Sequence, residues 1–182
     1  MSKELSLIIA ACKNGKHQAQ LQLYDLYCDA MFTIACRYLK NEEDAKDAMQ
    51  DGFLKAFSKI ERYTSEATLG SWLKTIIINQ CLDYLKKRKL EFVPLEDGNI
   101  EIANDEDWII NRPVSPEVIL THIRDLLQKY ATVLQLYLIE GYDHQEISEI
   151  LDIPPKTSRT HLHRGRILLK KQLEEYTYET GH

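Results

Sequence analysis

YDHQEISEILDIPPKTSRTHLHRGRILLKK, residues 142–171, carries the signals of two helices joined by a tight turn. Asp143 and Glu146 form a D-x-x-E start signal, in which each side chain can bond a free backbone N–H at the start of the first helix. In the turn Asp152-Ile153-Pro154-Pro155, aspartate tolerates a left-handed conformation and proline suits the first turn of the next helix. The stretch therefore predicts a helix-turn-helix, which can present side chains to the DNA major groove.

The second helix of this stretch has two chemically different sides. At 3.6 residues per turn, small or apolar residues share one side: Ser158, Leu162, Gly165 and Leu169. Polar and basic residues occupy the other side and its flanks: Lys156, Arg159, Thr160, His163, Arg164, Lys170 and Lys171. The preceding helix and turn favour DNA binding over a merely solvated basic face. Repressors, activators, recombinases and initiation factors share this motif, so it indicates DNA binding without indicating the class.

Composition favours an all-helical protein. The 182 residues suffice for one domain or two small ones, with 44% hydrophobic residues, seven glycines and five prolines. No apolar run approaches the ~20 residues that span a bilayer, and residues 1–16 lack a signal-peptide pattern, so we expect a cytoplasmic protein. The four cysteines form no C-x-x-C pair, and His161 and His163 diverge on a helix. We therefore expect free thiols, no metal site and no cofactor.

Charge and helix-breaking residues divide the chain. Residues 91–117 hold eight acidic residues and one basic residue, whereas basic residues cluster at 86–89 and 156–171. We interpret 91–116 as an acidic flexible linker between helical domains at 1–90 and 117–182. With a net charge of -5, the protein should bind DNA weakly unless a partner holds it there, because phosphate neutralisation supplies most non-specific affinity.

Helical periodicity predicts the elements of both domains. The first domain is expected to contain helices over about 5–14, 18–39, 42–59 and 69–89. The second is expected to contain helices over about 115–127 and 130–140, the latter ended by Gly141, before the helix-turn-helix. Both domains are therefore expected to be small helical bundles.

The segment DAKDAMQDGFLKAF, residues 44–57, predicts a helix with an unusual outward face. Its core side consists of Ala45, Met49, Gly52, Phe53 and Ala56. Two carboxylates, an amide and a leucine cluster opposite: Asp47, Gln50, Asp51 and Leu54. A leucine within an acidic face is consistent with a protein-contact surface, and equally with an ordinary amphipathic helix that carries one exposed leucine.

The segment LGSWLKTIIINQCLDYLKKRK, residues 69–89, predicts a helix that ends in four cations. Its buried side is expected to contain Trp72, Leu73, Ile76, Ile77, Cys81 and Leu85. The polar loop 62–68 before it could hold an unstacked base, since single-strand readers combine stacking with hydrogen bonds to base edges. Trp72 could serve as a stacking platform, but we interpret it as core because Leu73 and Ile76 continue its stripe.

Three motifs occur in an order that resembles one family. They are D-A-x-D-A-x-Q-D-x-F-L-K-A-F at 44–57, W-L…N…D-x-L-K-K-R-K at 72–89, and E-G-Y-x-x-x-E-I-S-E-I-L-x-I…T-S-x-T-H-L-x-R-G-R at 140–166. Together they resemble the extracytoplasmic-function sigma factors of bacterial RNA polymerase. The resemblance implies sigma region 2 at 1–90 and sigma region 4 at 117–182. Asp152 departs from the family pattern, which usually has glycine in this turn.

The resemblance also implies three sets of contact residues. Those for the clamp helices of the largest polymerase subunit are Asp47, Gln50, Asp51 and Leu54. Those for reading and melting the −10 element are Arg62, Tyr63, Thr64, Ser65, Asn79, Asp83, Lys86 and Arg88. Those for the −35 element are Lys156, Thr157, Arg159, Thr160, His163, Arg164 and Arg166. The acidic linker would run along the polymerase toward its RNA exit path.

The resulting hypothesis is a promoter-specificity subunit. It would join core RNA polymerase, recognise −35 and −10 promoter DNA, help open the duplex and leave after initiation. No nucleotide-binding glycine loop or nucleophile–base cluster is recognisable, so we expect no enzymatic activity and no small-molecule substrate. The resemblance further implies an anti-sigma factor as a partner. Two alternatives are a stand-alone helix-turn-helix regulator with residues 1–90 as a sensor or dimerisation domain, and a helical adaptor.

Overall fold

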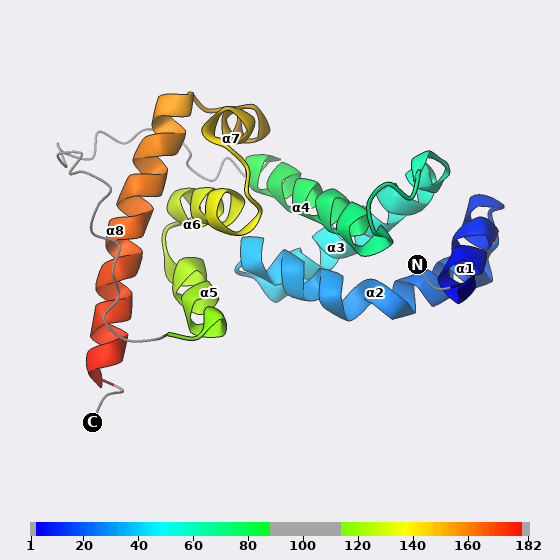
Figure 1. Ribbon diagram of the computed structural model, residues 1–182, viewed down its shortest axis with the longest axis horizontal. Helices are drawn as coiled ribbons and strands as arrows, with labels where there is room; N and C mark the ends of the chain where they lie inside the picture. Colours follow the sequence, from blue (N-terminus) through cyan, green and yellow to red (C-terminus); the bar gives the residue numbers. More distant parts are fainter. Residues whose placement is uncertain (1–2, 88–113, 180–182) are drawn as a thin grey trace. The chain divides into compact units, whose positions relative to one another are not determined.

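The computed structural model describes residues 3–87 and 114–179, and the elements within these ranges are all helical (Figure 1). The chain divides into two compact units, Met1–Arg88 and Lys89–His182. The expected all-α fold with two small helical domains is confirmed. Most of the expected linker, residues 91–113, lies outside the described residues. None of the described helices combines the length and the apolar character needed to cross a membrane.

Within the described residues 3–87, the first unit contains four α-helices and a short 3₁₀ turn. In chain order they are α1 Lys3–Lys13, α2 His17–Tyr38, α3 Glu42–Lys59, η1 Ile60–Arg62 and α4 Leu69–Lys87. Helices α2, α3 and α4 pack against one another, while α1 contacts α2 and η1. The four predicted helices are therefore present, and their buried faces form one core.

Local capping explains where α3 begins, and packing explains its small residues. The Asn41 side chain accepts hydrogen bonds from the backbone N–H groups of Glu43 (2.9 Å) and Asp44 (3.1 Å), which satisfies two free donors. Gly52 faces α4 so closely that a Cβ would overlap Ile77 Cδ1. A bulky residue at position 52 would therefore push α3 away from α4.

The predicted core faces are confirmed on α3 and corrected in part on α4. All five predicted core residues of α3 are buried. On α4 the buried stripe runs through Leu73, Ile77, Cys81 and Leu85, at intervals of four residues. Ile78 and Leu82, which directly follow stripe residues, are buried as well, whereas Trp72 and Ile76, which directly precede stripe residues and which we expected in the core, are only half-buried. None of the four cysteines is disulfide-bonded in the described part of the chain, and burial raises the pKa of the Cys81 thiol to about 12.

The second unit contains α5 Pro116–Asp125, α6 Gln128–Leu134, a π-helical segment η3 Gln135–Ile139, α7 His144–Leu151 and α8 Pro155–Glu179. Helix α8 packs against α5, α6 and α7 (Figure 1). Gly165 permits this approach, since a Cβ there would lie 2.9 Å from Leu134 Cδ1 and 3.3 Å from Tyr130 Cβ. The glycine predicted on the buried side of α8 therefore has a packing role.

The region of the predicted 130–140 helix is not one regular α-helix. It begins at Gln128 as α6 and widens into the π-helical segment Gln135–Ile139, in which the Glu140 N–H donates to Gln135 O at 3.0 Å. Gly141 follows with a φ of +80°, which glycine adopts without strain, so the expected end at this glycine is confirmed. Three apolar residues of the π-helical segment are exposed: Tyr137, Leu138 and Ile139.

Candidate nucleic-acid and protein interfaces

The helix-turn-helix of the second unit is built by the local signals at its start and turn. Asp143 Oδ1 accepts from the N–H groups of Gln145 (2.7 Å) and Glu146 (2.8 Å), and Glu146 Oε2 accepts from the Asp143 N–H at 2.8 Å. Asp152 ends α7 in the left-handed region, with φ 55° and ψ 49°. The Ser148 hydroxyl then donates to Ile153 O at 2.6 Å. The predicted capping box and left-handed aspartate are both present, and they fix how the chain enters α8.

Helix α8 has the two sides that its sequence predicts. Ser158, Leu162, Gly165 and Leu169 are buried, and Leu173 continues this side one turn further. None of the residues expected to contact the −35 element is buried; Lys156 and Arg159 are exposed, and the others are partly exposed. The Thr160 hydroxyl donates to the Lys156 carbonyl of its own helix at 3.0 Å. The surface facing solvent is therefore basic over the first three turns of α8.

His144 joins α7 to α8, a role that no pattern in the sequence indicated. Its Nδ1 lies 2.9 Å from Ser158 Oγ on the buried side of α8, and its ring stacks on Tyr137 with centroids 4.8 Å apart. Burial lowers the pKa of His144, and the nearby Arg159 guanidinium lowers it further against the opposing effect of Asp143. The neutral imidazole therefore fits this position near the exposed Arg159.

Acidification is expected to weaken the contact between α7 and α8. Because the folded-state pKa of His144 is lowered, its stabilising effect is present above the unfolded pKa of about 6.5 and is lost as pH falls below that value. The free energy of unfolding of wild type should therefore fall more steeply between pH 7.5 and 5 than that of His144→Gln. Urea titrations of the full chain measure the difference, and an NMR midpoint for His144 at or above 6.5 would contradict it.

The loop between η1 and α4 is an ordered turn with mostly exposed residues. The Tyr63 side chain is only 4% exposed; its hydroxyl donates to Ala67 O at 2.8 Å, and its ring centroid lies 5.4 Å from that of Trp72. Thr68 Oγ1 accepts from the Ser71 N–H at 3.2 Å at the start of α4. Arg62, Thr64 and Ser65 are exposed. Tyr63, which we expected among the −10 contacts, is therefore buried beneath the loop, where it contacts Ala67 and Trp72 and does not face solvent.

The remaining residues expected at the −10 element lie on α4. Asn79 and Lys86 are exposed, and Asp83 is half-buried. The Asp83 carboxylate lies 3.6 Å from Lys55 Nζ, and the same ammonium donates to Gln80 Oε1 at 3.4 Å. Arg88 lies outside the described residues. Asp83 is thus engaged with α3, while Asn79 and Lys86 are open to solvent.

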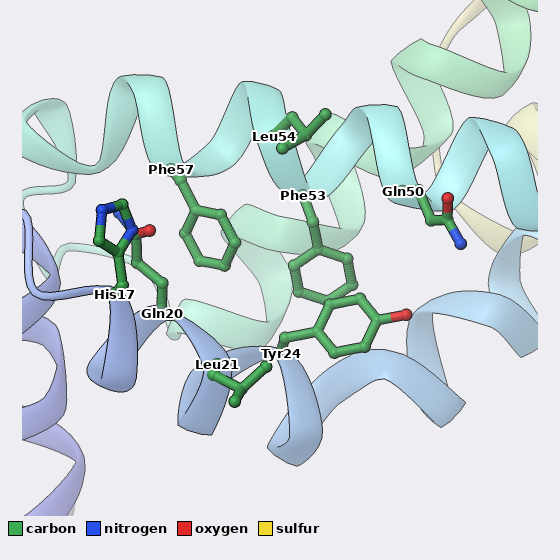
Figure 2. Close-up of a pocket in the computed structure, with 8 residues that line it drawn as sticks. All are labelled: His17, Gln20, Leu21, Tyr24, Gln50, Phe53, Leu54 and Phe57. Atoms are coloured by element: carbon green, nitrogen blue, oxygen red, sulfur yellow. The ribbon is translucent and has the colours of Figure 1, made fainter.

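The acidic face of α3 borders an apolar groove. Asp47, Gln50 and Asp51 are exposed, and Leu54 is 68% exposed. A groove of about 480 Å³ lies between α2 and α3, with Phe53 and Phe57 pointing from α3 toward α2 (Figure 2). Its lining residues are His17, Gln20, Leu21, Tyr24, Gln50, Phe53, Leu54 and Phe57.

Packed aromatic rings form part of this groove. The Tyr24 and Phe53 centroids are 4.8 Å apart, and those of Phe53 and Phe57 are 6.0 Å apart. Leu21 of α2 is 62% exposed at the same groove. The sequence predicted the part of this surface that lies on α3 but not the part on α2. Leu21 is one of many apolar residues in its helix, and its sequence position does not show that it is exposed. The two exposed leucines and the aromatic rings make the face suited to a protein partner.

Comparisons with known proteins agree on both units. Residues 23–91 match the family model for Sigma-70 region 2, and residues 117–169 match that for Sigma-70, region 4. The chain is 31% identical to the ECF RNA polymerase sigma factor SigW of Bacillus subtilis (strain 168), covering 92% of this chain and 95% of that protein. It is 25% identical to the ECF RNA polymerase sigma-E factor of Haemophilus influenzae, covering 92% and 94%. The structure of the sigma factor RpoE with the anti-sigma factor NepR from Bartonella quintana has a TM-score of 0.49 at 20% identity, covering 84% of this chain and 95% of that chain.

Proposed function

The chain belongs to the extracytoplasmic-function group of the sigma-70 family, and from this premise we propose which of its surfaces act in transcription initiation. It is an RNA polymerase sigma factor for transcription initiation, with core RNA polymerase and promoter DNA as partners. In our proposal the polymerase catalyses RNA synthesis and this chain selects the promoter, without enzymatic activity of its own. The proposed place of action is the cytoplasm, where the polymerase meets the chromosome.

The exposed face of α3 is the proposed docking surface for the clamp helices of the largest polymerase subunit. One observation carries this assignment: Leu54 is 68% exposed beside the carboxylates of Asp47 and Asp51 and at the edge of an apolar groove. A partner helix with apolar side chains and basic neighbours would match this surface in shape and charge. The groove adds Leu21 and Tyr24 of α2 to the residues expected to meet the polymerase.

Leu54→Ala is expected to weaken binding to core polymerase by about tenfold, since burial of one central apolar anchor commonly contributes more than 1 kcal/mol to an interface. Leu7→Ala is the matched control, because Leu7 on α1 is 66% exposed and does not line the groove. Both changes should alter the free energy of unfolding by less than about 0.5 kcal/mol. Titration of labelled protein with core polymerase measures both affinities, and equal affinities for the two variants would refute the docking assignment.

The other two exposed surfaces are proposed to read promoter DNA. The loop that follows η1, with Arg62, Thr64 and Ser65 exposed, would hold a base flipped from the −10 element, while Asn79 and Lys86 of α4 meet the adjacent strand. Tyr63 would support the loop from within. In the second unit, the basic side of α8 would enter the major groove at the −35 element. Its expected contact residues are Lys156, Thr157, Arg159, Thr160, His163, Arg164 and Arg166.

Regulation is proposed to act on the same surfaces. Members of this family are usually held inactive by an anti-sigma factor, and such a partner would cover the α3 face or the basic side of α8. A stand-alone helix-turn-helix regulator is not favoured. That alternative requires the first unit to be a sensor or dimerisation domain, whereas the first unit matches sigma region 2.

Reconstituted transcription tests the proposed function. The full chain, added to core polymerase and genomic promoter fragments, is expected to produce transcripts that start at fixed distances downstream of shared −35 and −10 sequences. The free chain should bind the same fragments weakly in a mobility-shift assay, given its net charge of -5. Tight sequence-specific binding by the free chain, with no promoter-dependent transcript in the presence of polymerase, would contradict the proposal.

A further inference from the structure

The last residue of α1 reaches the loop proposed to read the −10 element. Lys13 Nζ donates a hydrogen bond to the backbone carbonyl of Tyr63 at 2.9 Å, in a partly buried position. The two residues are separated by 50 positions in the chain. Helix α1 also packs against η1, the 3₁₀ turn that leads into the loop. Lys13 precedes the residues matched to sigma region 2, which begin at position 23.

Tyr63 anchors the start of the loop through several contacts. Its N–H donates to Ile60 O at 3.1 Å, its hydroxyl donates to Ala67 O at 2.8 Å, and its ring packs beside Trp72. The Lys13 bond secures the remaining polar group, the carbonyl. Both backbone groups and the side chain of Tyr63 are therefore held, and the carbonyl is held by a residue from outside the loop.

The exposed part of the loop begins directly after this carbonyl. The peptide plane that contains Tyr63 O also contains the N–H of Thr64, so holding the oxygen sets the direction in which Thr64 leaves. Ser65 follows with a φ of 66°, a left-handed conformation that non-glycine residues adopt only at a cost. The loop therefore depends on its fixed ends to keep one shape.

We propose that Lys13 is a positioning residue for promoter selection, which holds the loop after Tyr63 in the shape that accepts the flipped −10 base. The inference rests on the proposed role of the loop. A charged donor gives a stronger bond than a neutral one, and a preorganised loop loses less freedom when it binds its base. Lys13 touches no DNA in this proposal; it acts through Tyr63.

The test uses the full chain with core polymerase and two promoter sets, one substituted at each −10 position and one at each −35 position. Lys13→Met keeps the aliphatic chain and removes the donor, Lys13→Arg keeps a donor, and Lys16→Met is a matched control at an exposed lysine. Lys13→Met should lower discrimination between preferred and substituted −10 elements by about fivefold, corresponding to the loss of one hydrogen bond. Discrimination at the −35 element and affinity for core polymerase should stay unchanged, and Lys13→Arg should recover most of the loss.

A second variant and a second measurement separate positioning from simple support of the fold. Tyr63→Phe removes the hydroxyl bond to Ala67 and should lower −10 discrimination in the same way. Hydrogen exchange at the backbone N–H groups of 64–67 should be faster in both variants than in wild type, while exchange in α3 stays unchanged. Equal losses at both promoter elements and in polymerase affinity would overturn the inference, since they would indicate general destabilisation.

Loop substitutions distinguish failure of this inference from failure of the proposed function. If Thr64→Ala changes −10 discrimination and Lys13→Met does not, the loop reads the element without help from Lys13, and the inference is wrong. If neither variant changes discrimination, the loop is not the reader and both proposals are wrong. Loss in both variants, with recovery in Lys13→Arg, supports both.

Discussion

Replacing Asp51 with lysine is expected to reduce affinity for core RNA polymerase by about a hundredfold. Asp51 is exposed on α3, and its neighbours on that face are Asp47, Gln50 and Leu54. A partner that complements two carboxylates must present basic or donor groups, so a lysine would meet like charge, which costs several kcal/mol at an interface. A loss of about 2.7 kcal/mol corresponds to the expected hundredfold change. Co-purification and titration with core polymerase measure it.

Glu61→Lys is the control for this charge reversal. Glu61 is an exposed acid in η1 of the same unit and lies outside the docking face. Glu61→Lys therefore has the same net charge as Asp51→Lys but leaves the docking face unchanged. Because both side chains are exposed, neither substitution should change the free energy of unfolding by more than about 0.5 kcal/mol. Equal loss of polymerase affinity in the two variants would show that total charge, and not the α3 face, governs binding. Salt titration adds a check, since contacts of exposed charges weaken as ionic strength rises.

Features set by neighbouring residues could be predicted from the sequence. Asp143 and Glu146 form the expected capping box, and Asp152 takes the expected left-handed conformation. Each depends on residues within a few positions, where hydrogen-bond reach and backbone preference are fixed by residue type. The α3 face was predictable for a related reason: a helix buried along one side leaves its other side exposed, so periodicity alone placed Asp51 and Leu54 outward.

Features that depend on distant residues were not predictable. Tyr63 was expected among the residues that contact DNA, but it is buried: its ring packs beside Trp72, its hydroxyl donates to Ala67 O, and Lys13 of α1 donates to its carbonyl. Residue type gives no sign of such a contact, since an exposed loop tyrosine and a buried one have the same local sequence. The groove beside Leu54 likewise requires Leu21 of α2. Its existence depends on how two helices pack, which periodicity does not determine.

Backbone irregularity was also missed. The residues before Gly141 have an ordinary helical pattern, but Gln135–Ile139 are π-helical. Tyr137 of this segment stacks against His144, which in turn contacts Ser158 of α8. The π-helical segment is therefore linked through His144 to the helix that carries Arg159. The sequence identified that basic helix without indicating what holds it in place.

Arg159→Ala is expected to relax selection at one position of the −35 element, at a cost of ~1–3 kcal/mol for the preferred base. Arg159 is exposed on the basic side of α8, in its second turn. An arginine at such a position can donate two hydrogen bonds to a guanine edge, which no other base accepts in the same geometry. Its loss should therefore lower transcription from the preferred sequence by roughly fivefold to a hundredfold, while promoters already substituted at that base change little.

Lys171→Ala provides the comparison for Arg159→Ala, because it removes one positive charge from the same helix at an exposed residue about three turns beyond Arg159. A contact with phosphate contributes affinity without sequence information, so loss of a general charge should lower transcription from all −35 variants to the same small extent. The full chain with core polymerase and a library of −35 sequences gives both profiles by counting transcripts from each promoter. If the Arg159→Ala profile falls evenly across the library, as expected for Lys171→Ala, Arg159 contacts the backbone and does not read a base. A drop confined to one position would assign base recognition to Arg159, which follows Ser158 on α8 and lies near His144.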